Sequence, residues 1–178
     1  ENGNLLDNSF SYINTLRVVS SADLMNWTDH GEIAVAGPNG AATWATNSWA
    51  PAIAHKTIDG KEKFFLYFAN GGSGIGVLEG DSPLGPWKDP NGKALLTYGY
   101  PECQGVVWCF DPAVLVDDKG DGYIFFGGGV PEGQSLNPKT ARVAKLTDDM
   151  VHIEGNKAEM IDAPCMFEDS GIFQYNGK

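Results

Sequence analysis

The chain has 178 residues, and its 12 Lys and Arg stand against 23 Asp and Glu, which gives a formal net charge of -11. The basic residues are scattered, whereas phosphate binding needs clustered positive charge, so we expect no nucleic acid partner. No apolar run approaches the ~20 residues of a membrane span, and we expect no membrane partner either.

Runs rich in Val, Ile, Phe and Tyr, bounded by Gly, Pro, Asn and Asp, recur along the whole chain, and helical periodicity is almost absent. The sequence therefore predicts an all-β fold. The expected strands include residues 16–20, 32–35, 75–78, 94–96, 141–146 and 158–161, and two aromatic runs that end in glycines, 63–72 and 123–129.

Three segments, residues 47–55, 108–116 and 165–173, repeat one layout about 60 residues apart. Each puts a Pro or an acidic pair ahead of an expected strand. A period of this length holds four short strands, which make one propeller blade. A propeller needs at least four blades and about three fit here. We therefore expect part of a larger β-propeller, whose remaining blades lie beyond both ends or on another chain.

Between the expected blades run long, glycine-rich connections, residues 36–46 and 97–105, and a further polar loop covers 130–138. Loops of this length in a compact repeat are often functional, so we expect them to form walls of a pocket at the propeller axis. Trp27 and Trp87 stand at equivalent places in two periods, and we expect both to anchor packing between strands.

Asp111 and Glu168 occupy equivalent places in successive periods, and loops that recur once per blade converge on the axis. We therefore expect the two carboxylates to share one pocket. Asp111 precedes Pro112, a context that favours extended backbone. Glu168 follows Phe167 and other apolar residues, and an apolar collar raises a carboxyl pKa, as a general acid requires.

Two carboxyls that meet beside aromatic rings suit the cleavage of a glycosidic bond, in which one protonates the leaving oxygen and another activates water or attacks. Each ring taken alone is also an ordinary core residue. Among these aromatic residues, we expect Trp49 above all to contact a sugar. It stands near the expected axis, at the point in its repeat where the later repeats have Asp111 and Glu168. The nominated substrate-binding residues are Trp49, Trp108, Phe110 and Phe167, and Trp44 lies nearby.

The three cysteines, Cys103, Cys109 and Cys165, lack the spacing of a zinc site, and His55 and His152 do not fall where a ligand is expected. We therefore expect no metal and no cofactor. Cys103 and Cys109 are either a disulfide, in an oxidising compartment, or two separate buried thiols, and we favour the thiols.

Five pieces of the sequence together resemble glycoside hydrolase family 43, whose members are five-bladed propellers acting on xylan and arabinan side chains. These pieces span nearly the whole chain in family order: residues 21–31, 48–51 with 64–68, 81–87, 110–118 and 167–172. The resemblance implies that residues 1–178 are part of a single catalytic propeller domain, from the end of blade 1 to the start of blade 4.

The resemblance also implies roles for individual residues. Glu168 would be the general acid, and Asp111 would orient it and raise its pKa by like-charge repulsion. Trp49 would line the subsite of the released sugar. The implied activity is that of an inverting β-xylosidase or α-L-arabinofuranosidase on xylan or arabinoxylan oligosaccharides, and a secreted or periplasmic location is favoured.

One part of the family pattern is missing. Family members carry the general base in an Asp-Pro segment upstream of the first strand, and nothing in residues 1–15 matches it; Asp7 lacks that context and is not nominated. We expect this chain alone to be inactive and the intact protein to be active. The alternatives are a carbohydrate-binding propeller without turnover and a protein-interaction propeller, which leaves the two acids unexplained.

Overall fold

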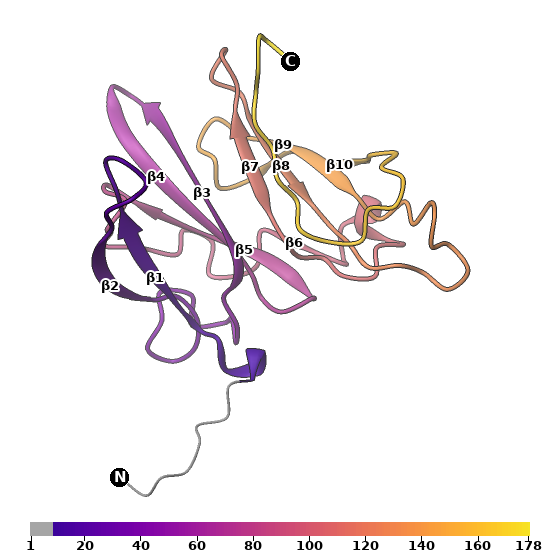
Figure 1. Ribbon diagram of the computed structural model, residues 1–178, viewed down its shortest axis with the longest axis horizontal. Coiled ribbons are helices and arrows are strands. Elements are labelled where there is room, and N and C mark those ends of the chain that lie inside the picture. Colours follow the sequence, from indigo (N-terminus) through magenta and orange to yellow (C-terminus); the bar gives the residue numbers. More distant parts are fainter. Residues whose placement is uncertain (1–8) are drawn as a thin grey trace, which may run out of the picture.

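The computed structural model describes residues 9–178, and its strands form three antiparallel sheets (Figure 1). The first sheet pairs β1 (Thr15–Ser20) with β2 (Thr28–Ala34). The second runs in chain order through β3 (Trp49–Ile58), β4 (Lys61–Ala69), β5 (Gly74–Gly80) and β6 (Leu96–Thr97). The third contains β7 (Ala113–Val116), β8 (Gly122–Phe126), β9 (Arg142–Leu146) and β10 (Ile153–Met160). Two short 3-10 helices are η1 (Phe10–Tyr12) and η2 (Pro101–Cys103).

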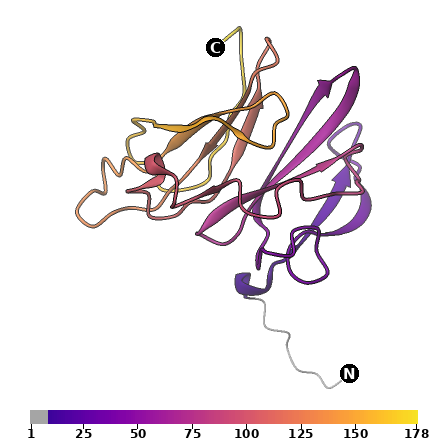
Figure 2. The same ribbon diagram turned by 180° about the vertical axis from the view of Figure 1, so that it is seen from behind.

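The two four-stranded sheets are meanders in which each strand pairs with the next one in sequence, as in propeller blades. Figures 1 and 2 show the three sheets following one another side by side, and the first strands of the two complete blades, β3 and β7, contact each other. The predicted all-β propeller architecture is confirmed, with β1 and β2 corresponding to the last two strands of the blade before.

Turn chemistry sets the register of the inner hairpins. Between β3 and β4, Asp59 and Gly60 have φ of 51° and 75°, the positive values that a tight two-residue hairpin requires. Between β7 and β8, the Asp117 carboxylate accepts hydrogen bonds from the backbone N–H groups of Lys119 and Asp121, both 2.9 Å. The two turns fix the pairing of β3 with β4 and of β7 with β8.

Two hydrophobic clusters hold the blades together. One lies between the complete blades, where the buried Tyr67 of β4 reaches across and donates a 2.7 Å hydrogen bond from its hydroxyl to the Met150 carbonyl. The other joins the β1–β2 hairpin and its following loop to the opposite face of β4, through Val35, Leu66 and Phe68. Alternate β4 side chains thus serve different clusters, as the period of a strand requires.

The structure corrects three expectations. β2 begins at Thr28, four residues before the expected start, and no strand forms in residues 161–178, where the third repeat lies without a pairing partner in the described chain. Trp27 is 56% exposed and belongs to neither hydrophobic cluster of residues 9–178, whereas Trp87 packs against the second cluster as expected. Within residues 9–178, no helix is long and apolar enough to cross a bilayer.

Candidate functional site

The segment that leads into β7, residues 108–112, is hydrogen-bonded to two glycine-rich turns. The N–H of Cys109 donates to the Gly72 carbonyl at 2.8 Å, and the N–H of Trp108 donates to the Gly128 carbonyl at 3.1 Å. These bonds join the β4–β5 turn, the approach to Asp111 and the β8–β9 turn into one surface. Asp111 itself has φ of 49°, so the extended backbone expected before Pro112 is wrong, and the residue sits in the strained left-handed region.

The third repeat lies against this surface. The Gly129 N–H donates to the Phe167 carbonyl at 2.6 Å, and the Asp169 N–H donates to the Asp111 carboxylate at 2.9 Å. Glu168 lies between these two anchored positions, so the structure brings its segment against Asp111. The approach is close: a Cβ added to Gly128 would lie 2.6 Å from the Phe167 oxygen.

The two acids differ in burial. Burial raises the pKa of the half-buried Asp111; the hydrogen bond from Asp169 opposes this, and the negative charges of Glu168 and Asp169 add to it. Glu168 is exposed, and Phe167 beside it is 53% exposed. The apolar collar that the sequence suggested around Glu168 is therefore not formed by the residues described here.

The nominated aromatic residues divide into two kinds. Phe110 is buried, with its ring edge 2.6 Å from where a Gly128 Cβ would lie, so it supports the site from the core and offers no open face to a ligand. Trp108 is 42% exposed and packs on Phe110 with ring centroids 5.3 Å apart. Trp49 is half-buried, donating from Nε1 to the Phe10 carbonyl at 2.8 Å.

The β4–β5 turn separates the two indoles. A Cβ on Gly71 would lie 3.8 Å from the Trp49 ring, and a Cβ on Gly72 would lie 3.0 Å from the Trp108 ring. Two tryptophans from successive blades thus flank one glycine turn. A side chain at Gly72 would press on the Trp108 ring, whereas a Cβ at Gly71 would make only ordinary contact with Trp49.

Tyr98 belongs to the same surface, although no motif pointed to it. Its hydroxyl lies 2.7 Å from the Gly72 carbonyl, 2.6 Å from the Val107 carbonyl and 3.3 Å from the Cys109 N–H. The length of the 97–105 connection indicated function, but which of its side chains would turn inward depends on the tertiary fold.

The remaining titratable side chains do not form a metal site. Among residues 9–178, no group of three or more His, Cys, Asp or Glu is arranged to hold a metal ion. Cys103 and Cys109 are buried free thiols, and Cys165 is exposed. His55 pairs with Glu62, and His152 pairs with Asp149. Asp7 lies outside the described residues.

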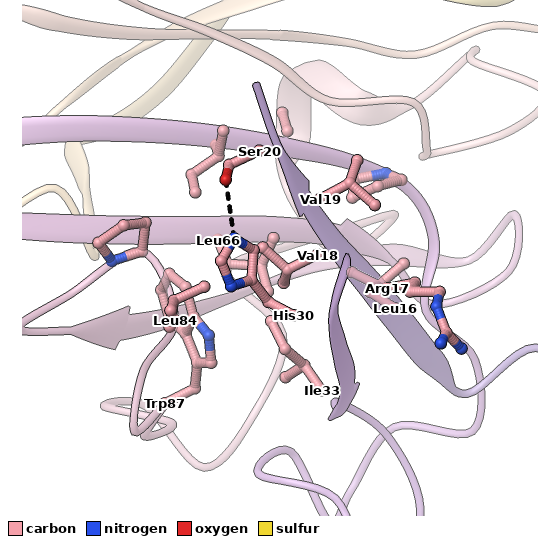
Figure 3. Close-up of a pocket in the computed structure, with 14 residues that line it drawn as sticks. Leu16, Arg17, Val18, Val19, Ser20, His30, Ile33, Leu66, Leu84 and Trp87 are labelled. Atoms are coloured by element: carbon pink, nitrogen blue, oxygen red, sulfur yellow. Dashed lines mark hydrogen bonds between the residues drawn. The ribbon is translucent and has the colours of Figure 1, made fainter. Parts of the chain in front are cut away.

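A groove of about 530 Å³ lies elsewhere, between the β1–β2 hairpin and the second sheet (Figure 3). Leu16, Val18 and Ile33 face Leu66 and Trp87 across it. At its rim, Ser20 Oγ and His30 Nε2 are 2.7 Å apart. No carboxylate lines this groove, so it cannot supply the acid–base pair that glycoside cleavage needs.

Comparison with known proteins adds independent information. A model of glycosyl hydrolases family 43 matches residues 4–178. An arabinoxylan arabinofuranohydrolase of Bacillus subtilis is 60% identical over 99% of the chain and 36% of the relative. One of Paenibacillus polymyxa is 57% identical over 100% of the chain and 29% of the relative.

A solved structure agrees with these sequence matches. It is a family 43 arabinoxylan arabinofuranohydrolase from Bacillus subtilis in complex with cellotetraose, which superimposes with a TM-score of 0.93 at 60% identity. The match covers 99% of this chain and 38% of that one. The chain therefore spans about a third of the length of these relatives.

Proposed function

The chain belongs to glycosyl hydrolase family 43, and from this premise we propose that it forms part of an arabinofuranosidase that releases arabinose side groups from arabinoxylan. Residues 1–178 would be one part of its catalytic propeller domain. The choice of arabinose over xylose is supported by the two relatives at 57% and 60% identity, both named arabinoxylan arabinofuranohydrolases.

Glu168 is the proposed general acid, which protonates the glycosidic oxygen as the bond to the sugar breaks. Its exposed carboxyl is free to meet a substrate, and the neighbouring backbone is held by the bonds of Phe167 and Asp169. The observation that carries the proposal is the Asp111–Asp169 hydrogen bond, because it sets a second carboxylate next to the acid. Asp111 orients the Glu168 segment through this bond to the backbone of the following residue.

The reaction would proceed with inversion. In inverting enzymes, a third group activates water on the far side of the sugar ring, across the pocket from the acid. We assign that general base to no residue of this chain. Trp49 and Trp108 would contact the sugar, since aromatic rings offer broad apolar faces for the C–H groups of a pyranose or furanose.

The test uses full-length protein and arabinoxylan oligosaccharides, with released sugars identified by chromatography and the first-formed anomer by NMR. We expect arabinose with inverted configuration, and we expect Glu168→Gln to lower kcat ~10²–10⁴-fold, the usual contribution of a general acid. Glu32→Gln, at an exposed site on β2, is the matched control.

Other outcomes separate the competing functions. Release of xylose alone would replace the arabinofuranosidase by a β-xylosidase. Oligosaccharide binding without any turnover would favour a carbohydrate-binding propeller. Full activity of Glu168→Gln would remove Glu168 from the mechanism.

A further inference from the structure

Arg142, the first residue of β9, is 5% exposed, and its guanidinium is directed at backbone oxygens. Nε donates to the Glu102 carbonyl at 2.5 Å, and Nη2 donates to the Gln104 carbonyl at 3.3 Å. Nη1 donates to the carbonyls of Lys139 and Ala141 at 2.8 and 2.9 Å. No ion pair with a carboxylate joins it within residues 9–178.

These four carbonyls belong to two different segments. Glu102 and Gln104 lie in the connection that leads from the second sheet to Asp111, whereas Lys139 and Ala141 lie at the end of the loop between β8 and β9, residues 127–141. A buried arginine normally pairs with an acid. Here it joins two loops that are separate in sequence.

Each of these segments leads by direct contacts to one of the two acids. On one side, the connection continues through Val107 to Trp108, which stands three residues before Asp111. The N–H groups of Val107 and Trp108 both donate to the Gly128 carbonyl at 3.1 Å.

On the other side, the buried Thr140 hydroxyl donates to the Gly129 carbonyl at 2.9 Å, and the Gly129 N–H holds the Phe167 carbonyl next to Glu168. The same loop also accepts the Cys165 N–H at the Leu136 carbonyl, at 3.1 Å.

We propose that Arg142 is a positioning residue for the reaction. It would fix the spacing between Asp111 and Glu168 by bridging the connection that leads to Asp111 and the β8–β9 loop, against which the Glu168 segment lies. This inference rests on the proposed function. The planar guanidinium presents its donors in a fixed fork, so it can satisfy four separate carbonyls at once. A lysine ammonium has three donors from one point and cannot reach both loops with the same geometry.

The experiment compares two substrates that share the arabinofuranosyl group. An arabinoxylan oligosaccharide has a poor leaving group, which needs the proton of a general acid, while a 2,4-dinitrophenyl arabinofuranoside has one that departs without a proton. The measured quantity is the ratio of kcat/KM for the first substrate to that for the second. Because both values come from one preparation, this ratio does not depend on the fraction of protein that is folded.

In full-length protein, we expect Arg142→Lys and Arg142→Met each to lower this ratio at least tenfold, as a misplaced acid fails mainly on the poor leaving group. Glu168→Gln should lower it at least as far. The chain's other arginine, Arg17, is exposed on β1 and pairs with Asp29, so Arg17→Met should leave the ratio unchanged.

Two results would overturn the inference in different ways. If Glu168→Gln lowers the ratio but both Arg142 variants lose the two activities in equal proportion, Arg142 only stabilises the fold. If Glu168→Gln leaves the ratio unchanged, the proposed function has failed first, and the role of Arg142 fails with it.

Discussion

The carboxylate of Asp111 accepts a 2.9 Å hydrogen bond from the backbone N–H of Asp169, the residue that follows Glu168. Both partners have positive φ, 49° for Asp111 and 66° for Asp169, a conformation that costs energy for residues other than glycine. A backbone donor cannot swing away as a side chain can. The bond therefore fixes the path of the chain on one side of Glu168, while the Phe167 carbonyl fixes it on the other.

Asp111→Asn should reduce activity while preserving stability at neutral pH. Burial raises the folded-state pKa of Asp111 above its unfolded value of about 3.9, so the folded protein binds this proton more tightly. Its ionisation therefore costs stability as the pH rises from about 3.9 through the raised pKa. Asn keeps an oxygen that accepts the Asp169 N–H and carries no charge.

Calorimetric unfolding of the Asp111→Asn variant and the wild type across this pH range provides the measurement. The stability difference should move in favour of the variant as pH rises, while kcat at pH 7 falls about 10²-fold or more. Asp118→Asn, on the exposed β7–β8 turn, removes the same formal charge and controls for the change in net charge. A variant that grows less stable than the wild type with rising pH would contradict the account of Asp111.

Gly128→Ala should displace the segment that carries Glu168. The added Cβ would lie 2.6 Å from both the Phe167 oxygen and a ring carbon of Phe110, distances at which backbone or ring must move. We expect a loss of about 1–3 kcal/mol in the free energy of unfolding, as in other overpacked sites, together with a fall in kcat.

Gly171→Ala is the matched control for Gly128→Ala, because a Cβ there would meet no atom within 4 Å and its φ is not in the left-handed region. Denaturant titration and steady-state kinetics measure the two effects. Equal behaviour of the two variants would mean that the close approach at Gly128 is not needed.

Sequence reasoning reached the architecture because the fold repeats. The three equivalent segments and their glycine-ended aromatic runs are local patterns, and each complete blade forms from consecutive hairpins. Blade equivalence also indicated that Asp111 and the Glu168 segment would meet, although they are 57 residues apart in sequence. Such an argument needs only the period of the repeat and the convergence of equivalent loops.

Other features escaped sequence reasoning because they depend on contacts between distant loops. Nothing local to Arg142 shows that its donors will find carbonyls in two separate segments, and Tyr98 is one of several aromatic residues in its loop. The extended backbone expected at Asp111 was wrong, because the preference of a residue before proline gives way to local hydrogen bonds. The Phe110 carbonyl accepts the Gly127 N–H, and the Asp111 carboxylate accepts the Asp169 N–H. Exposure of Trp27 likewise depends on which elements pack beside it.

Trp49→Ala should weaken substrate binding if its ring contacts the sugar. We expect KM to rise roughly tenfold, which corresponds to about 1.4 kcal/mol. Trp49→Phe keeps an aromatic ring but loses the Nε1 hydrogen bond to the Phe10 carbonyl, so it separates the ring from that bond. Trp27→Ala, at an exposed tryptophan in the turn just before β2, should leave KM unchanged. Unaltered KM in Trp49→Ala would assign the residue to packing alone.

The cysteines provide a prediction that is independent of activity. The hydrogen bond with Cys103, together with burial, raises the pKa of the Cys109 thiol, and both side chains are fully buried. The same hydrogen bond lowers the pKa of the Cys103 thiol, so burial and not thiol ionisation is what protects Cys103. Neither buried thiol should react with iodoacetamide in the native protein, whereas the exposed Cys165 should.

Peptide mapping by mass spectrometry distinguishes the two thiols from a Cys103–Cys109 disulfide. After denaturation without a reductant, both residues should be alkylated, and Cys165→Ser should abolish native labelling of its own peptide while leaving theirs unchanged. Recovery of a 103–109 peptide lighter by two hydrogens and resistant to alkylation would instead establish the disulfide. In that case the loop that leads to Asp111 would be held by a covalent link in addition to its hydrogen bonds.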